Sequence, residues 1–123
     1  GFLSLMAPSG LLDEMDEPLM AVANCVSGCG IAFAAMFLEA LADGGVACGL
    51  PRPDAVRFAA QTLLGAAQMV LETGKHPDQL KNDVCSPGGS TIQGVRTLEQ
   101  RAVRAAVMDA VIAACEKNAA LGK

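Results

Sequence analysis

The apolar residues of this 123-residue chain recur mainly at intervals of three and four, the spacing that places them on one face of an α-helix. The pattern is clearest between residues 53 and 73, where Val56, Ala59, Leu63 and Val70 fall on a single face. No convincing run of residues alternates between apolar and polar as a half-buried strand would. The sequence therefore predicts an all-α domain built from several helices.

Proline, glycine and acidic residues mark where these helices begin and end. An acidic cluster at residues 13–17 precedes a proline, and acidic residues favour a helix start because they suit the positive end of its dipole. Gly49 and Gly74 are natural C-terminal caps. After Thr91 the chain is expected to be helical almost to its end, as one helix or as two with a kink near Gln100. The earlier helices are predicted over residues 16–26, 31–48, 53–73 and 77–82.

Composition adds the expectation of a large subunit interface. Apolar residues make up 52% of the chain and charged residues 18%, below the usual share of about 25%. A small protein of this kind has more apolar surface than one compact copy hides. The net charge of −4, with scattered basic residues, disfavours nucleic acid as a partner. No uninterrupted run of about 20 apolar residues occurs, and no signal peptide is visible, so we expect a cytoplasmic protein without a membrane span.

The cysteines and the histidine give little sign of chemistry. The five cysteines are an odd number without a CxxC pair, and they are expected to be buried, free thiols in a reducing compartment. One histidine, His76, is too few for an ordinary zinc site, so no metal is predicted. It precedes a proline and is expected to cap a helix or to lie on the surface. Cys29 and Cys85 lie in glycine-rich loops, but no nearby histidine would activate either as a nucleophile.

The segment Ser86–Thr91, with the sequence SPGGST, is the most distinctive loop. Two glycines leave main-chain N–H groups accessible, and the helix that follows presents unpaired donors and a partial positive charge. The loop could therefore hold a carboxylate or a phosphate. The alternative is an ordinary tight turn in which a serine caps the helix. It is not a phosphate-binding loop of the Walker type, because no lysine follows the glycines, and the Gly28–Gly30 stretch lacks the strand and third glycine of a dinucleotide site.

The chain carries an ordered series of short motifs. They are EALADGGV at 39–46, GLPR at 49–52, AQTLLGAA at 60–67, HPxQLK at 76–81, and DVCSPGGSTI at 83–92 followed by Gly94, Leu98 and Glu99. In this order and at these spacings the series resembles the pyrroline-5-carboxylate reductase family over about residues 18–114. The chain looks like the C-terminal helical dimerisation domain of such an enzyme.

That resemblance implies a protein in two parts. An N-terminal Rossmann domain would bind NADPH or NADH, and a C-terminal helical domain would interlock with a second copy to form a homodimer. Some family members assemble further into rings of dimers. Residues 1–14 would be a tail or the remnant of the end of the missing Rossmann domain, and residues 15–123 the dimerisation and substrate-binding domain.

The resemblance also implies a reaction. Hydride would pass from the nicotinamide to the imine carbon of Δ1-pyrroline-5-carboxylate and give L-proline, a reaction of proline biosynthesis. Ser86, Gly89 and Ser90 would hold the substrate carboxylate by hydroxyl and main-chain N–H groups. Thr91 would donate a hydrogen bond to the ring nitrogen and act as the catalytic residue. No cofactor-binding residue is expected in this chain, which alone should be inactive.

Two segments depart from the family pattern. The family has Ser-Gly-Ser-Gly-Pro-Ala-Tyr where this chain has SGCGIAF at 27–33. A glycine pair often breaks the last helical region of the family near position 100, but here the sequence is Gln100-Arg101-Ala102, which predicts a straighter helix. Two other functions stay open: a free-standing helical dimerisation module without activity, and an unrelated domain that binds a small anion.

Overall fold

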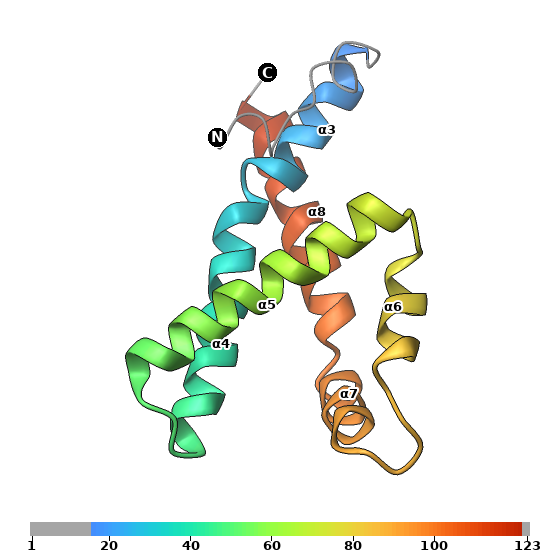
Figure 1. Cartoon of the computed structure of the whole chain (residues 1–123). Coiled ribbons are helices and arrows are strands. Elements are labelled where there is room, and N and C mark those ends of the chain that lie inside the picture. The colour runs from blue at the N-terminus through green and yellow to red at the C-terminus, as the bar shows by residue number, and fades with distance from the viewer. Residues whose placement is uncertain (1–15, 122–123) are drawn as a thin grey trace. The chain divides into compact units, whose positions relative to one another are not determined.

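The structure is a computed structural model that describes residues 16–121. The described part contains helices and no strand, so the all-α prediction is confirmed there. The predictions made for residues 1–14 lie outside the described residues. In chain order the helices are α3 (Glu17–Ser27), α4 (Gly30–Ala47), α5 (Arg52–Thr73), α6 (Pro77–Asp83), α7 (Ser90–Gln100) and α8 (Val103–Leu121) (Figure 1).

Local chemistry fixes the helix ends close to where the sequence predicts them. The carboxylate of Asp16 caps α3 by accepting a hydrogen bond of 3.1 Å from the main-chain N–H of Leu19. Beyond α4, Gly49 adopts a φ of +108°. At the end of α5, Gly74 has a φ of +69°, and its N–H donates to the carbonyl of Val70 at 3.0 Å. These backbone conformations suit glycine because a Cβ would strain them.

The chain divides into two compact units, and the first of them runs from Ala35 to Arg104. Its buried core is the contact between α4 and α5, where Ala42, Ala55 and Ala59 are each at most 6% exposed. Larger side chains pack around this contact and are partly buried: Leu38, Val46 and Leu50. Helix α4 continues through Gly45, although glycine disfavours a helix interior. A Cβ at that position would lie 3.4 Å from Leu50, which is an ordinary van der Waals distance.

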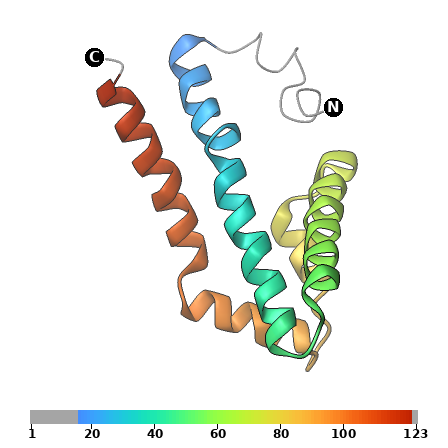
Figure 2. The same cartoon turned by 90° about the vertical axis from the view of Figure 1, so that its left-hand side faces the viewer.

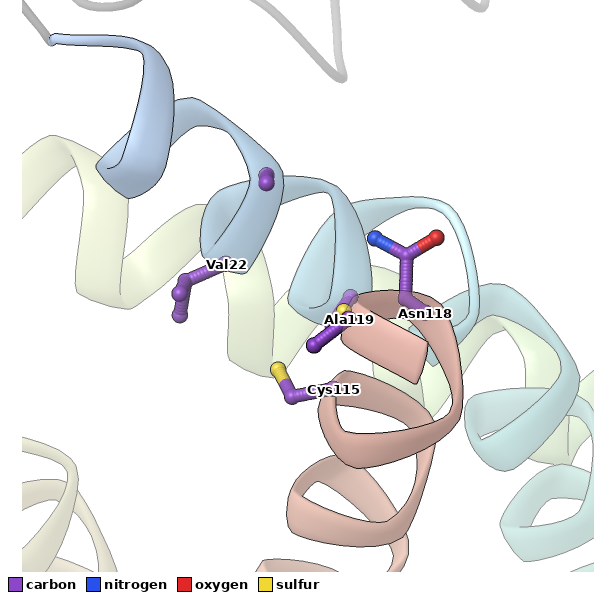
Figure 3. Close-up of a pocket in the computed structure, with 6 residues that line it drawn as sticks. Val22, Cys115, Asn118 and Ala119 are labelled. Carbon is purple, nitrogen blue, oxygen red and sulfur yellow. The ribbon is translucent and has the colours of Figure 1, made fainter. Parts of the chain in front are cut away.

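The second unit consists of the described residues up to Ala34 and those from Ala105 onward. It holds α3, the start of α4 and most of α8. Its buried hydrophobic residue is Cys25, which is 3% exposed. Residues of α3 and of the last turns of α8, including Val22, Cys115, Asn118 and Ala119, line a shallow pocket of about 100 Å³ (Figure 3).

Most large apolar side chains of the described residues remain exposed within a single chain. Phe58 is 54% exposed, Met36 70% and Leu71 77%. Within the stretch Glu17–Ala47, an 18-residue window has a mean hydropathy of 1.8 and is 6% buried, so this stretch is long and apolar enough to cross a membrane. This argues only weakly for membrane insertion, because apolar helices that are covered by protein meet the same two criteria.

The helical region after Thr91 consists of two helices that meet near Gln100, which is one of the two alternatives that the sequence left open, and not of one straighter helix. Helix α7 ends at Gln100, and Ala102 adopts a left-handed φ of +57° before α8 begins (Figure 2). The N–H of Arg101 donates to the carbonyl of Thr97, and that of Ala102 donates to Glu99, both at 3.1 Å. These bonds close the end of α7 without a glycine. Where the family often has glycine at this break, this chain has Ala102 in the left-handed conformation, which glycine adopts more easily than alanine.

We therefore expect Ala102→Gly to stabilise the fold by about 1 kcal/mol, because it removes the contact of a Cβ with its own backbone in the left-handed region. Ala106→Gly, the same change inside α8, should destabilise it by about 1 kcal/mol. Urea unfolding of both variants followed by circular dichroism measures the difference. A destabilised Ala102→Gly variant would contradict the assignment of strain to this residue.

Candidate functional site

The Ser86–Thr91 loop begins with a tight turn. The N–H of Gly89 donates to the carbonyl of Ser86 at 3.1 Å, and Gly88 has a φ of +72°. Pro87 occupies the second position of this turn. Proline second and a glycine of positive φ third are the signature of a type II turn. Residues 86–89 thus form a type II turn, and the proline and glycine within the turn are sufficient to explain it.

The turn delivers the chain directly into α7 without a side-chain cap. Gly89 is the N-cap residue, and no side chain bonds to the helix start. The interpretation that a serine caps this helix is therefore wrong, because Ser90 is already the first helical residue. A Cβ on Gly89 would lie 2.6 Å from the hydroxyl oxygen of Ser86. Glycine here leaves room for that hydroxyl beside the helix start.

Main-chain donors at the start of α7 have no acceptor within the part of the chain that the structure describes. Among residues 16–121, the N–H groups of Ser90 and Thr91 make no hydrogen bond, as expected for the first turn of a helix. The N–H of Gly89 already donates to Ser86 in the turn and is not free to bind a ligand. The contribution of Gly89 is instead the space that its missing side chain leaves open. No charged side chain occurs between Val84 and Gln93, so the local positive potential comes from the helix start itself.

The hydroxyl of Thr91 also differs from the other threonine hydroxyls of the described helices. Those of Thr62, Thr73 and Thr97 each donate to the carbonyl four residues earlier, at 2.7, 2.5 and 3.0 Å. Thr91 makes no such bond in the part of the chain that the structure describes, because no helical carbonyl precedes it by four residues. Its side chain is exposed, as are those of Ser86 and Ser90. The loop therefore presents three hydroxyls and two N–H groups to a ligand, which suits an anion with an adjacent acceptor.

Known protein families provide an independent comparison for this helical chain. Residues 17–121 match the family described as pyrroline-5-carboxylate reductase dimerisation. The chain belongs to this family. The resemblance drawn from the ordered motifs is confirmed.

Relatives and solved structures agree with that assignment. Pyrroline-5-carboxylate reductase of Escherichia coli K12 is 46% identical over 121 residues, covering 98% of this chain and 45% of that protein. The Arabidopsis thaliana enzyme is 49% identical over 119 residues, covering 97% of the chain and 43% of that enzyme. The crystal structure of Plasmodium falciparum pyrroline carboxylate reductase with NADP bound aligns with a TM-score of 0.84 at 40% identity, over 89% of this chain and 43% of that one. The chain thus spans less than half the length of the relatives it matches.

The other residues considered from sequence have structural roles. His76 is the N-cap of α6, and its Nδ1 accepts a hydrogen bond of 3.1 Å from the N–H of Asp78, so the expected capping role is confirmed. Neither the Ser86–Thr91 loop nor His76 lines the pocket beside Val22 and Cys115 or the pocket beside Leu41 and Phe58. Within residues 16–121, no group of three or more potential metal ligands comes together.

The five cysteines are free, as expected, but the expectation that they are buried holds only for Cys25. Cys29 and Cys48 are exposed, and Cys85 and Cys115 are half-buried. A hydrogen bond with the Cys115 thiol, together with removal from water, raises the pKa of Cys25 to about 11. A thiol with a raised pKa forms little of the nucleophilic thiolate. Cys25 is therefore buried and protonated, unlike a catalytic cysteine, which is exposed and forms a thiolate.

Sequence reasoning missed the ion pair of Asp83 with Lys75 and its hydrogen bond with Gln79. Asp83, the last residue of α6, accepts hydrogen bonds from Lys75 Nζ at 3.2 Å and from Gln79 Nε2 at 2.8 Å. These two donors lower the pKa of the Asp83 carboxyl. The four-residue spacing of Gln79 and Asp83 was a readable signal for their bond, whereas the eight-residue spacing of Lys75 and Asp83 was not.

Asp83 should make folding stability depend on pH in the acidic range. Because its pKa is lowered in the folded chain, the carboxylate stabilises the fold above its ordinary pKa of 3.8, and this contribution is lost as pH falls through the folded value. Asp83→Asn should remove that part of the pH dependence. Urea unfolding at a series of acidic pH values tests it, with Asp109→Asn in α8 as the matched control. An equal change in both variants would contradict the role of Asp83.

Proposed function

We propose that this chain is the dimerisation and substrate-binding part of a pyrroline-5-carboxylate reductase, which reduces Δ1-pyrroline-5-carboxylate to L-proline with NADPH or NADH. The observation that carries the proposal is the start of α7. There the Thr91 hydroxyl and the N–H groups of Ser90 and Thr91 have no partner among the described residues, in a chain of this family. The identity of 46% to the Escherichia coli reductase supports the same activity for the whole protein.

The substrate has two features that this loop can recognise. Its carboxylate is an anion, which the N–H groups at the helix start and the hydroxyls of Ser86 and Ser90 would bind. Its ring contains an imine nitrogen, to which Thr91 would donate a hydrogen bond. That bond polarises the C=N group and makes its carbon a better hydride acceptor, and it strengthens as the nitrogen gains electron density during reduction. Gly89 would let the substrate and the Ser86 hydroxyl approach the helix start closely.

The described residues do not fit a dinucleotide. The glycine-rich stretch Gly28–Gly30 joins two helices and follows no strand, unlike a dinucleotide-binding turn. We therefore propose that NADPH or NADH is held by a separate nucleotide-binding domain, in keeping with the NADP bound in the Plasmodium falciparum relative. The active site would then be completed only when both parts meet.

The same proposal includes a homodimer. The family is described by its dimerisation, and side chains such as Phe58, Leu64 and Met69 leave about half of their surface exposed in one chain. A second copy would cover them, and dimers could assemble further into a ring. The free thiols suit a reducing compartment such as the cytoplasm.

Thr91 provides the direct test of the reaction. The chain is joined to the nucleotide-binding half of the Escherichia coli relative, and pyrroline-5-carboxylate-dependent oxidation of NADPH is measured. We expect Thr91→Ala to lower kcat by about a hundredfold, the usual scale for a hydrogen-bond donor that acts in the transition state. Thr91→Ser should retain most of the activity because it keeps the hydroxyl.

Thr97→Ala is the matched control for this experiment. Its hydroxyl lies on the same helix but already donates to the carbonyl of Gln93, so its loss should leave kcat unchanged. Equal activity of the Thr91→Ala and Thr97→Ala proteins would contradict the catalytic role. An unmodified fusion without activity would instead support a dimerisation module that has lost the chemistry.

Light scattering after gel filtration tests the dimer. The chain without detergent should elute at twice its mass of 12.5 kDa at micromolar concentration. Phe58→Asp should shift it toward the monomer, because the dimer would bury an unpaired charge. A monodisperse monomer of the unmodified chain, or a chain that requires detergent, would overturn this part of the proposal.

A further inference from the structure

One guanidinium group connects three helices around the Ser86–Thr91 loop. Arg104, in the first turn of α8, places Nη2 3.2 Å from a carboxylate oxygen of Asp78 and Nε 3.2 Å from one of Glu99. Asp78 lies in the first turn of α6, and Glu99 in the last turn of α7. The loop leaves the end of α6 and enters the start of α7. Both of its flanking helices are therefore tied to the same side chain.

Helix stability does not explain the charges at Glu99 and Arg104. A negative charge near a helix C-terminus and a positive charge near a helix N-terminus both oppose the helix dipole. Helix α7 has no basic residue in its last turn, and α8 has no acidic residue in its first. The ion pair between Glu99 and Arg104 offsets both unfavourable placements. Their charges thus fit a role in joining the helices.

Packing within the chain does little to fix the two helices that carry the loop. Neither α6 nor α7 contains a buried residue among those described. The Asp78–Arg104 pair links positions 26 residues apart, and the segment that it closes contains the whole loop. The polar contacts of Arg104 therefore restrain α6 and α7, which contribute no residue to the alanine core of α4 and α5.

We propose that Arg104, through Asp78 and Glu99, is a positioning residue that holds the Ser86–Thr91 loop in the geometry that binds the substrate. This rests on the proposed function. The three side chains are each about half exposed, at 51%, 50% and 51%, and exposed pairs stabilise a fold only slightly. Loss of the pairs should therefore change substrate recognition more than stability. A small displacement of the donors is sufficient, because binding and catalysis depend steeply on their position.

The first test uses the fusion with the Escherichia coli nucleotide-binding half. Arg104→Gln should raise the KM for pyrroline-5-carboxylate by about tenfold and leave the KM for NADPH and the unfolding midpoint nearly unchanged. Asp78→Asn should act in the same direction, and the double variant should lose less than the product of the two effects, because both changes break one contact. Arg104→Lys should recover part of the effect, since it keeps the charge but not the two separate donors.

Arg57→Gln is the matched control, because it breaks the exposed Arg57–Asp54 pair of 3.1 Å on α5, away from the loop. The proposal is overturned if Arg57→Gln raises the KM for pyrroline-5-carboxylate as much as Arg104→Gln, or if Arg104→Gln raises the KM for NADPH equally. A purely structural role would lower the unfolding midpoint without separating the two KM values.

A second measurement on the 123-residue chain does not depend on activity. Hydrogen exchange of the hydrogen-bonded amides of Val84, Cys85 and Gly89 should be at least about fivefold faster in Arg104→Gln than in Arg57→Gln, because loss of local restraint opens these bonds more often. Equal exchange in the two variants overturns the positioning role. If the unmodified fusion is inactive but exchange differs as expected, the proposed function fails while the restraint of the loop by Arg104 stands.

Discussion

The contact between α4 and α5 depends on three alanines, and the size of these side chains constrains everything else. Ala42, Ala55 and Ala59 let two helices approach closely, but each buries little apolar area. A buried methyl group contributes roughly 0.8 kcal/mol, against about 1.5–3 kcal/mol for a buried leucine or phenylalanine. Meanwhile Leu41 and Phe58 remain exposed beside the same contact. A chain that uses its smallest side chains inside leaves its largest ones exposed, and the proposed dimer would cover them.

The candidate site depends on hydrogen-bond donors at the start of α7 that have no acceptor among the described residues. A helix start always leaves unpaired N–H groups, and most helices satisfy some of them with a polar N-cap side chain. The turn before α7 puts Gly89 at that position instead. The same placement leaves Thr91 without a carbonyl to accept its hydroxyl. Donors left free in this way stay available to a ligand, and their positions are set by a turn of a few residues.

This locality explains what could be predicted from sequence. The helix ends at Asp16, Gly49 and Gly74 depend on neighbouring residues, so their positions were predictable, and so was the helix that follows the two glycines of the Ser86–Thr91 loop. Contacts between distant residues were not. Asp78 and Arg104 carry no sequence signal of their pairing, and the exposure of Cys29 and Cys48 depends on how helices pack. The roles of Ser86, Gly89, Ser90 and Thr91 toward a substrate came from the family resemblance and stay predictions.

The break between α7 and α8 shows how local strain and a distant contact fit together. In a continuous helix, residues five apart point about 140° away from each other around the axis, so Glu99 and Arg104 would not meet. The left-handed conformation of Ala102 interrupts the helix between them and permits their contact at 3.2 Å. Such a conformation costs about 1–2 kcal/mol for an alanine, and exposed ion pairs contribute about 0.2–1 kcal/mol each. The two exposed pairs at Arg104 therefore offset only a part of the strain. The sequence left one long helix and two helices with a kink near Gln100 both open, because Gln100-Arg101-Ala102 contains no glycine or proline to mark the break.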